Sequence, residues 1–269
     1  MIDKFIIIKG KVAGPKSMVL AGVHGNEVCG IKALQKIIPK IKIDCGQVIF
    51  GFGNPRAIRK NIRQTAENLN RMFKSVSEYS KKQKQSYEYK RAQLLKKYFD
   101  KVEVLLDLHA SFAPNDRPFV ICKKKDQEFA KFLPLKTVVF GFDAIEPGGT
   151  DYYMNQKGKV GFCVECGYFT DNKAVKVAEK TILNFLKARG HLKSNLKKEK
   201  QKYLQVNYLY YTKTNKFVLK KEFADFEKIK KGQLIGFDGT KKVLSPQTGF
   251  ILFSTNREKK GSEGFLLGK

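Results

Sequence analysis

The chain of 269 residues is long enough to bury a sizeable core, as one large domain or as one domain with a smaller companion. Its hydrophobic content of 42% and charged content of 29% are typical of a soluble globular protein. No apolar run approaches the roughly 20 residues that a membrane-spanning helix needs, which excludes an integral helical membrane protein.

Lysine and arginine number 53 against 25 acidic residues, a formal net charge of +28. Such an excess is compatible with nucleic-acid binding, because phosphate neutralisation drives non-specific affinity. The lysines are spread along the chain, with local densities at 81–97 and 193–202, and no recognisable DNA- or RNA-binding motif accompanies them. Attraction of small anionic substrates is the more economical use of this charge. The sequence does not favour nucleic acid as a partner, and the purpose of the charge stays open.

The cysteines and the N-terminal residues both concern the cellular compartment. Five cysteines are an odd number, which favours reduced thiols over a disulfide framework. The apolar run within residues 1–9 is too short for the core of a signal peptide, and no small-residue cleavage site follows it. We therefore expect a cytoplasmic protein without membrane attachment.

The first patterned stretch places a histidine and a glutamate three residues apart behind an apolar run. Residues 17–23 predict a short buried strand, and residues from Asn26 onward predict a helix with one apolar face. Near a helix start, residues three apart share a face, so His24 and Glu27 can converge on one cation. Imidazole and carboxylate together suit zinc, and a catalytic zinc site needs a third protein ligand and an open position. Taken alone, such a pair more often marks a capped loop with a surface glutamate than a metal site.

A second buried strand, at 47–53, leads into a basic connection that contains Arg63. The adjacent Asn70 and Arg71 follow, and their forked donors suit a carboxylate. Residues 76–99 predict a lysine-rich helix, so the polar connection lies between two regular elements.

The strand predicted at 102–109 ends in a histidine. In open α/β sheets, ligands bind beyond the carboxyl ends of the strands, and His109 stands at such an end. Asp107 shares its strand face and is placed to orient the imidazole. His191, in contrast, follows a glycine just past a helix, where we expect a solvated side chain.

The strand predicted at 160–167 carries Glu165 among apolar residues, and a buried carboxylate needs a partner or a chemical role. Cys163 and Cys166 bracket this acid. Positions three apart on a strand face opposite ways and no second such pair exists, so neither a redox pair nor a zinc knuckle is favoured.

The end of the sequence changes character. Asp171 is expected to cap a helix that runs to about residue 189, and a lysine-rich linker follows at 193–202. From Tyr203 onward, short alternating segments separated by glycine turns predict a small all-β domain. We therefore predict a catalytic domain at 1–192 and a C-terminal β domain at 200–269.

Four elements stand in a fixed order, namely His24-x-x-Glu27, Asn70-Arg71, Asp107-Leu-His109 and Glu165. With the Gly-Asn-Pro at 53–55, this ordered set resembles the succinylglutamate desuccinylase and aspartoacylase family, within the zinc carboxypeptidase-like superfamily. The resemblance runs from about residue 19 to 167 and continues more weakly into the C-terminal part. It implies an α/β fold with a mixed sheet flanked by helices and a small C-terminal all-β domain.

The resemblance also implies a reaction and a cofactor. One zinc ion per chain would be held by His24, Glu27 and His109, with Glu165 as the general base that later returns a proton to the leaving amine. Zinc lowers the pKa of a bound water to about 7, so the base need only assist. The implied reaction is hydrolysis of an N-acylated amino acid, such as succinylglutamate or acetylaspartate, to an acid and a free amino acid.

For the substrate, the resemblance implies that Arg63 stabilises the oxyanion and that Asn70 and Arg71 hold a carboxylate. Two departures concern specificity. Residues 149–159 lack the further arginine with which aspartoacylases hold the substrate's side-chain carboxylate. The family's Asp-Leu-Asn-Arg begins here with Asn68, which removes a negative charge. Because of these two departures, the sequence does not determine the acyl group or the amino-acid side chain of the substrate.

Two alternatives remain. A carboxypeptidase of the same superfamily would use the same Asn-Arg pair to bind a peptide C-terminus. From another class, a basic nucleic-acid-binding protein on a decayed hydrolase scaffold would explain the charge, but it would not explain why each polar catalytic position is filled. We expect a small anionic substrate, and a homodimer is left open.

Overall fold

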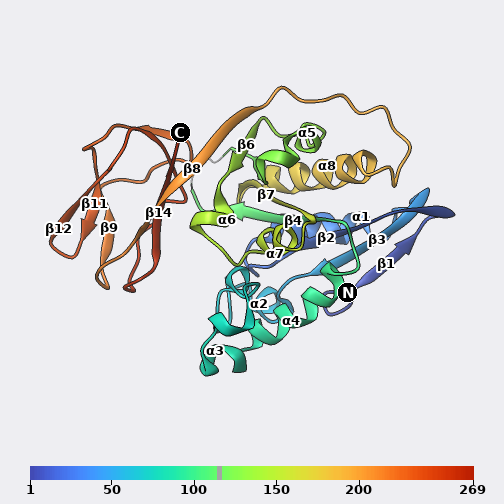
Figure 1. Cartoon of the computed structure of the whole chain (residues 1–269), viewed down its shortest axis with the longest axis horizontal. Helices are drawn as coiled ribbons and strands as arrows, with labels where there is room; N and C mark the ends of the chain where they lie inside the picture. The colour runs from blue at the N-terminus through green and yellow to red at the C-terminus, as the bar shows by residue number, and fades with distance from the viewer. Residues whose placement is uncertain (114–116) are drawn as a thin grey trace.

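The computed structural model describes residues 1–113 and 117–269. Within these residues, eleven strands form one mixed sheet in the order β1-β3-β2-β4-β7-β5-β6-β8-β14-β13-β10, and a separate three-stranded sheet has the order β12-β11-β9 (Figure 1). The strands are β1 (Ile6–Lys9), β2 (Val12–Ala21), β3 (Cys45–Phe52), β4 (Val104–Ser111), β5 (Phe119–Ile121), β6 (Thr137–Phe140), β7 (Val160–Tyr168), β8 (Lys202–Tyr211), β9 (Phe217–Leu219), β10 (Glu227–Ile229), β11 (Leu234–Asp238), β12 (Lys241–Leu244), β13 (Gly249–Leu252) and β14 (Glu263–Gly268). The predicted α/β class is confirmed.

Helices cover both faces of the central strands (Figure 1). They are α1 (Val28–Ile37), α2 (Pro55–Lys60), α3 (Lys81–Gln85), α4 (Tyr87–Phe99), α5 (Gln127–Ala130), α6 (Phe142–Ile145), α7 (Thr150–Gln156) and α8 (Asn172–Ala188), with 3-10 turns at Leu69–Arg71, Val76–Glu78 and Lys124–Asp126. Alternation along β2 explains the two layers, because successive side chains of a strand point to opposite faces. Val19 and Ala21 pack with α1 and α8, whereas Met18 and Leu20 pack with α4 and α7.

Two predicted helices differ in outcome. Asp171 caps α8 through a hydrogen bond from the main-chain N of Lys173, as predicted. The single helix predicted at 76–99 is broken, because Ser86 has an extended backbone that ends α3 and its hydroxyl caps α4. Within the described part of the chain, none of the helices has the length and apolarity to cross a bilayer.

The prediction that His191 is solvated is wrong. Its side chain is fully buried, with Nδ1 3.0 Å from the carbonyl oxygen of Cys45 and Nε2 2.8 Å from the hydroxyl of Ser17. Gly190 adopts a positive φ of 76° and turns the chain back against the sheet. Burial lowers the pKa of His191, which favours a neutral imidazole that joins α8 to β2 and β3.

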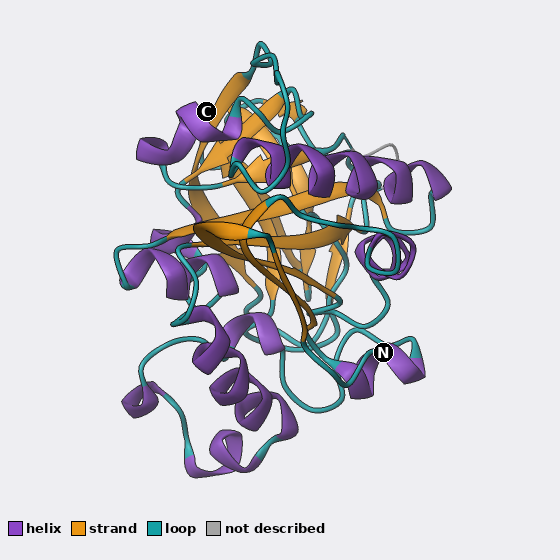
Figure 2. Cartoon of the chain, turned by 90° about the vertical axis from the view of Figure 1, so that its right-hand side faces the viewer, coloured by secondary structure: helices purple, strands orange, loops and turns teal. Residues whose placement is uncertain are grey.

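The C-terminal strands extend the central sheet. After α8, residues 189–201 cross over the top of the molecule in Figure 1 and reach β8, which pairs in parallel with β6. Strands β14, β13 and β10 then continue the sheet in antiparallel order. Figure 2 shows the strands in the middle of the molecule, with helices above and below them. The small antiparallel sheet was expected, but the hydrogen-bonded junction at β6 and β8 was not.

Candidate active site

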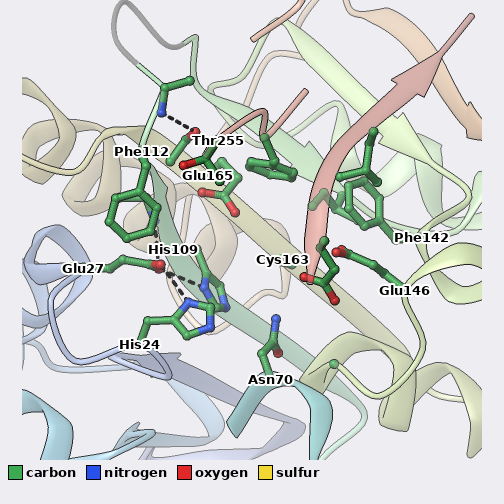
Figure 3. Close-up of a pocket in the computed structure, with 18 of the residues that line it drawn as sticks. His24, Glu27, Asn70, His109, Phe112, Phe142, Glu146, Cys163, Glu165 and Thr255 are labelled. Atoms are coloured by element: carbon green, nitrogen blue, oxygen red, sulfur yellow. Dashed lines mark hydrogen bonds and ion pairs between the residues drawn. The ribbon is translucent and has the colours of Figure 1, made fainter. Parts of the chain in front are cut away.

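A cavity of about 380 Å³ lies beyond the carboxyl ends of β2, β4 and β7 (Figure 3). This is where open α/β sheets bind ligands, and the volume is in the range of small-molecule sites. All of the side chains singled out from the sequence line this cavity, namely His24, Glu27, Arg63, Asn70, Arg71, His109 and Glu165. The cavity thus brings together side chains from segments that are far apart in the sequence.

The first two of these residues lie on a turn and not on a helix face. Helix α1 begins at Val28, so Glu27 is the residue before it and His24 lies one turn earlier. Gly25 allows this turn to pack on α2, because a Cβ there would lie 2.1 Å from the carbonyl carbon of Ala57. The Gly25 main-chain N also donates to the carbonyl oxygen of Arg63, so the turn brings three cavity residues together.

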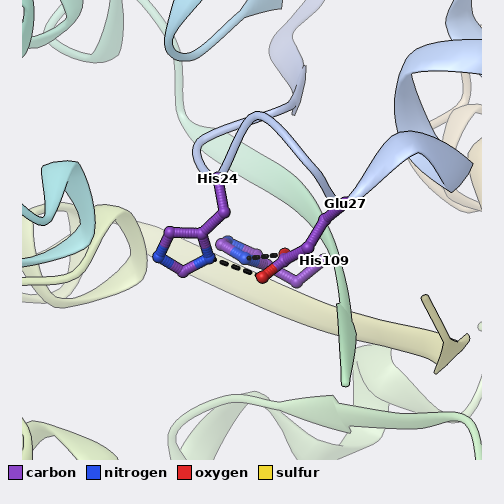
Figure 4. A group of neighbouring side chains, drawn as sticks. All are labelled: His24, Glu27 and His109. Carbon is purple, nitrogen blue, oxygen red and sulfur yellow. Dashed lines mark hydrogen bonds and ion pairs between the residues drawn. The ribbon is translucent and has the colours of Figure 1, made fainter. Parts of the chain in front are cut away.

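Two imidazoles converge on one carboxylate (Figure 4). Nδ1 of His24 lies 2.7 Å from Oε1 of Glu27, and Nδ1 of His109 lies 3.0 Å from Oε2. All three side chains are at least 95% buried, and their candidate donor atoms lie within 4.8 Å of one another. Burial, with Arg63 nearby, lowers the pKa of His24 to about 4. His24 is therefore neutral at pH 7, the form in which histidine binds a metal.

The other nitrogen of each ring is held by an oxygen. Nε2 of His24 lies 3.0 Å from Oδ1 of Asn68, which also accepts from the main-chain N of Asn70. Nε2 of His109 lies 2.9 Å from Oδ2 of Asp107, which also accepts from the Thr150 hydroxyl. The predicted orienting role of Asp107 is thus confirmed by contact.

These outer contacts decide what the cluster can hold. Both nitrogens of each ring face an oxygen acceptor, and a neutral imidazole can donate to only one of them. With the protons on Nε2, both Nδ1 atoms and the carboxylate of Glu27 are free to bind one cation. Two nitrogens and a carboxylate, backed by oxygen partners, are a donor set suited to a catalytic zinc ion. The residues present fit such an ion.

Glu165 lies beside this cluster. The register of parallel strands β4 and β7 pairs it with His109, and it is only 7% exposed. Its Oε2 is buried without a hydrogen-bond partner among residues 1–113 and 117–269. Burial, with the neighbouring charge of Glu27, raises the pKa of Glu165 well above its usual value. A carboxylate in this state is suited to accepting and returning a proton.

The two predicted arginines are already engaged. Nη1 of Arg63 lies 3.0 Å from Oε1 of Glu27. Arg71 was expected to present a free fork to a substrate carboxylate. Instead its Nη2 lies 2.7 Å from Glu146 and its Nε lies 2.8 Å from Glu263. Two carboxylates of the protein therefore bind the edge of the Arg71 guanidinium that we expected to bind a carboxylate of the substrate.

Several residues of the cavity wall were not anticipated. Asp143, Glu146 and Asp151 come from the segment before and within α7. Arg257 comes from the connection between β13 and β14, and Glu263 is the first residue of β14. Nothing in their spacing distinguishes them from ordinary surface charges. The one indication in the sequence was the absence of an arginine from residues 149–159, which showed that this segment differs from that of aspartoacylases.

Glu88 anchors the connection that carries Arg63 and Asn70. It is fully buried, and its carboxylate accepts from Thr65 and from the side chain of Asn54. Glu88→Gln should lower the free energy of unfolding at pH 7 by about 1–3 kcal/mol, because an amide leaves a buried donor unsatisfied.

The pH dependence of this effect has a definite sign. Burial opposes ionisation, but the hydrogen bonds from Thr65 and Asn54 outweigh it and lower the pKa of Glu88. The stabilisation is therefore present above the pKa of the unfolded chain and is lost as pH falls through the lower folded value. Urea unfolding of wild type and Glu88→Gln should differ at pH 7 and converge as the pH falls below the folded pKa of Glu88. A gap that stays the same across this range would contradict the anchoring role.

Comparisons with known proteins agree with this geometry. The succinylglutamate desuccinylase/aspartoacylase catalytic domain matches residues 13–189. Succinylglutamate desuccinylase of Pseudomonas aeruginosa is 24% identical over 94% of this chain and 84% of that protein. The crystal structure of succinylglutamate desuccinylase from Vibrio cholerae shares the fold with a TM-score of 0.79 at 16% identity, covering 98% of this chain and 85% of that one.

A crystal structure from Rhodobacter sphaeroides, described as succinylglutamate desuccinylase/aspartoacylase, has a TM-score of 0.76 at 17% identity and covers 98% of this chain and 88% of that one. At such identities the structural likeness concerns the fold alone. The domain match, in contrast, spans most of the chain and contains each of the residues first singled out from the sequence. The chain therefore belongs to the succinylglutamate desuccinylase/aspartoacylase family.

Proposed function

We propose that the protein is a zinc-dependent hydrolase that cleaves the amide bond of an N-acylated amino acid. The hydrolase class follows from family membership, whereas the zinc dependence, the site roles and the substrate are the proposed part. The observation that carries the proposal is the pair of Nδ1 atoms directed at Glu27, each ring held from behind by an oxygen. This arrangement is suited to binding a cation.

We propose His24, Glu27 and His109 as the protein ligands of one zinc ion per chain. When bound there, zinc supplies Lewis-acid polarisation and lowers the pKa of water. Three protein ligands leave one coordination position open, which is the pattern of catalytic and not of structural zinc. The chain provides the remaining functions with its own side chains.

Glu165 is proposed to move the proton. Its partnerless Oε2 takes a proton from the attacking water and then gives it to the leaving amine. The raised pKa supports the second half of this task, because a carboxyl with a high pKa holds the proton until the C–N bond breaks. Arg63 lies at the edge of the same cluster, where its N–H groups can stabilise the oxyanion of the tetrahedral intermediate.

Asn70 and Arg71 are proposed to contact a substrate carboxylate. Glu146, Glu263 and the carbonyl oxygen of Asn70 each take one N–H of the Arg71 guanidinium. An arginine has five such donors, so one remains on each terminal nitrogen. Arg71 can therefore contact the substrate, but with less net positive charge than a free fork would offer.

The test is a panel of N-acyl amino acids and short peptides incubated with zinc-loaded protein, with amine release as the readout. Release from one or more N-acyl amino acids, abolished by a chelator and restored by zinc, is the expected result. Cleavage of peptides alone would favour the carboxypeptidase alternative. No release from any compound would contradict the proposal.

A separate prediction concerns the support of the metal ligands. Asp107→Asn should weaken zinc affinity about 10–100-fold, because the amide orients His109 less firmly than a carboxylate does. Competition with a chelator measures this affinity. Asp171→Asn is the matched control, since asparagine caps a helix as well as aspartate and α8 begins outside the cavity. Equal affinity in both variants would contradict the role of Asp107.

A further inference from the structure

The cavity has the opposite charge to the rest of the molecule. The whole chain has a formal net charge of +28. Of the residues that the structure describes, those lining the cavity include six carboxylates and three arginines but no lysine. Three of these acids, Asp143, Glu146 and Asp151, come from one segment of the chain. None of the three has a proposed catalytic or zinc-binding role. A solvated basic surface therefore surrounds an acidic interior.

One of these three acids, Asp151, lies within residues 149–159, the segment that lacks the arginine of aspartoacylases, and the other two come shortly before it. Residues 149–159 bring no cation to the cavity. Asn155 is buried with its amide directed at Asp143, and Lys157 is exposed to solvent. Where the resemblance implies a group that holds an anion, this segment thus provides a carboxylate.

Protein cations neutralise these acids only in part. Asp143 has Lys123 at 3.5 Å. Glu146 shares Arg71 with Glu263, so two carboxylates face one guanidinium. Asp151 is 8% exposed and lines the cavity, and it makes no ion pair with any residue of the described ranges. A buried carboxylate without a counter-ion is costly, which points to a cation supplied by a ligand.

The pKa values are consistent with a missing cation. Burial, with nearby Asp143, raises the pKa of Asp151 to about 6. Burial raises the pKa of Glu146 to about 7 despite the contact with Arg71. A positive ligand group beside these acids would favour their ionised forms.

Positive charge is concentrated elsewhere on the wall. Nε of Arg257 donates to the main-chain carbonyl of Glu263 at 2.7 Å, and the guanidinium forms no ion pair among the residues described. Arg63 lies close enough to lower the pKa of Arg257. Two neighbouring guanidinium groups favour an anion between them. The cavity therefore offers separate sites for a carboxylate and for a cation.

We propose that the substrate is an N-acyl amino acid whose side chain ends in a cationic group such as a primary amine, received by Asp151 and Glu146. This rests on the proposed function and narrows it to one substrate class. The α-carboxylate would then lie toward Arg71 and Arg257, both of which donate to Glu263, and Arg63 would face the oxyanion. The expectation of an anionic substrate is revised accordingly, and N-succinylglutamate and N-acetylaspartate should be poor substrates.

The experiment compares Nα-acetylornithine, Nα-acetylnorvaline and N-acetylglutamate on zinc-loaded protein. These compounds share an acyl group and similar length but differ in side-chain charge. We expect kcat/KM for the cationic compound to exceed that of the neutral one by at least about tenfold and that of the anionic one by about 100-fold, since each tenfold step needs only about 1.4 kcal/mol. Preference for N-acetylglutamate would overturn the inference and leave the proposed function intact.

Two variants test whether Asp151 and Glu146 cause the preference for the cationic compound. Asp151→Asn should abolish the preference for the cationic compound over the neutral one. Glu146→Gln should reduce the preference in the same direction, which keeps the test available if the first variant folds poorly. Asp126→Asn is the matched control, because Asp126 is a partly buried aspartate that does not line the cavity. An unchanged preference in both cavity variants would overturn the assignment of these acids.

A binding measurement separates the two proposals. Calorimetry of zinc-loaded protein with ornithine, norvaline and glutamate does not require turnover. Suppose that no N-acyl amino acid is hydrolysed but ornithine binds at least tenfold more tightly than norvaline and glutamate. The proposed reaction is then contradicted, whereas the proposed binding site for a cationic side chain is supported. If ornithine binds no more tightly than norvaline, the proposed binding site for a cationic side chain is contradicted.

Discussion

Replacing His109 with alanine should remove the tightly bound divalent ion from the purified protein, and His24→Ala should do the same. Each change takes one of three converging donors and leaves Glu27 with a single imidazole partner. Because polarisation by a bound metal ion contributes several kcal/mol, kcat/KM should fall by about 10³ or more. Elemental analysis of freshly purified protein gives the stoichiometry, expected to drop from one ion per chain to nearly none.

His191 provides the matched control for this experiment. It is as buried as His109 but lies outside the cavity and bonds to Cys45 and Ser17. His191→Gln should lower thermal stability and leave the metal content unchanged. Full retention of the ion in both His24→Ala and His109→Ala would show that other residues hold it.

Glu165→Gln should separate metal binding from chemistry. Glutamine keeps the shape and hydrogen-bonding capacity of glutamate but cannot accept the water proton, so kcat should fall by about 10²–10⁴-fold. The zinc content should stay at the wild-type level, because Glu165 is not among the three proposed ligands. Steady-state kinetics and elemental analysis of the same preparation give both quantities.

Two outcomes would argue against this role. Near-normal turnover in Glu165→Gln would remove the residue from the mechanism. Loss of zinc together with activity would instead make it a ligand, which the proximity of its carboxylate to His109 and Cys163 makes a necessary check.

The part of the site that could be predicted from sequence lies at strand ends. Buried strands have a clear apolar pattern, and polar residues at or near their carboxyl ends must lie along one edge of a parallel sheet. This was sufficient to bring His24, His109 and Glu165 to one cavity. The shared strand face of Asp107 and His109 also followed, because strand residues two apart point the same way, whereas the direct contact between them is a finding of the structure.

The remaining features depend on partners that no local pattern reveals. Arg71 pairs with Glu263, which lies 192 residues later in the sequence. The turn after Gly190 buries His191 against strands from the beginning of the chain. Periodicity shows which face of an element is buried, but it does not show which distant element covers it.

Strand β14 has a consequence for biosynthesis. It lies inside the extended sheet, between β8 and β13, and it supplies Glu263 to the cavity wall. Ribosomes release a chain from its N-terminus, so the three proposed zinc ligands emerge long before this strand does. While they are already present in the nascent chain, Arg71 still lacks one of its two acidic partners. The wall of the cavity is therefore completed only at the end of translation.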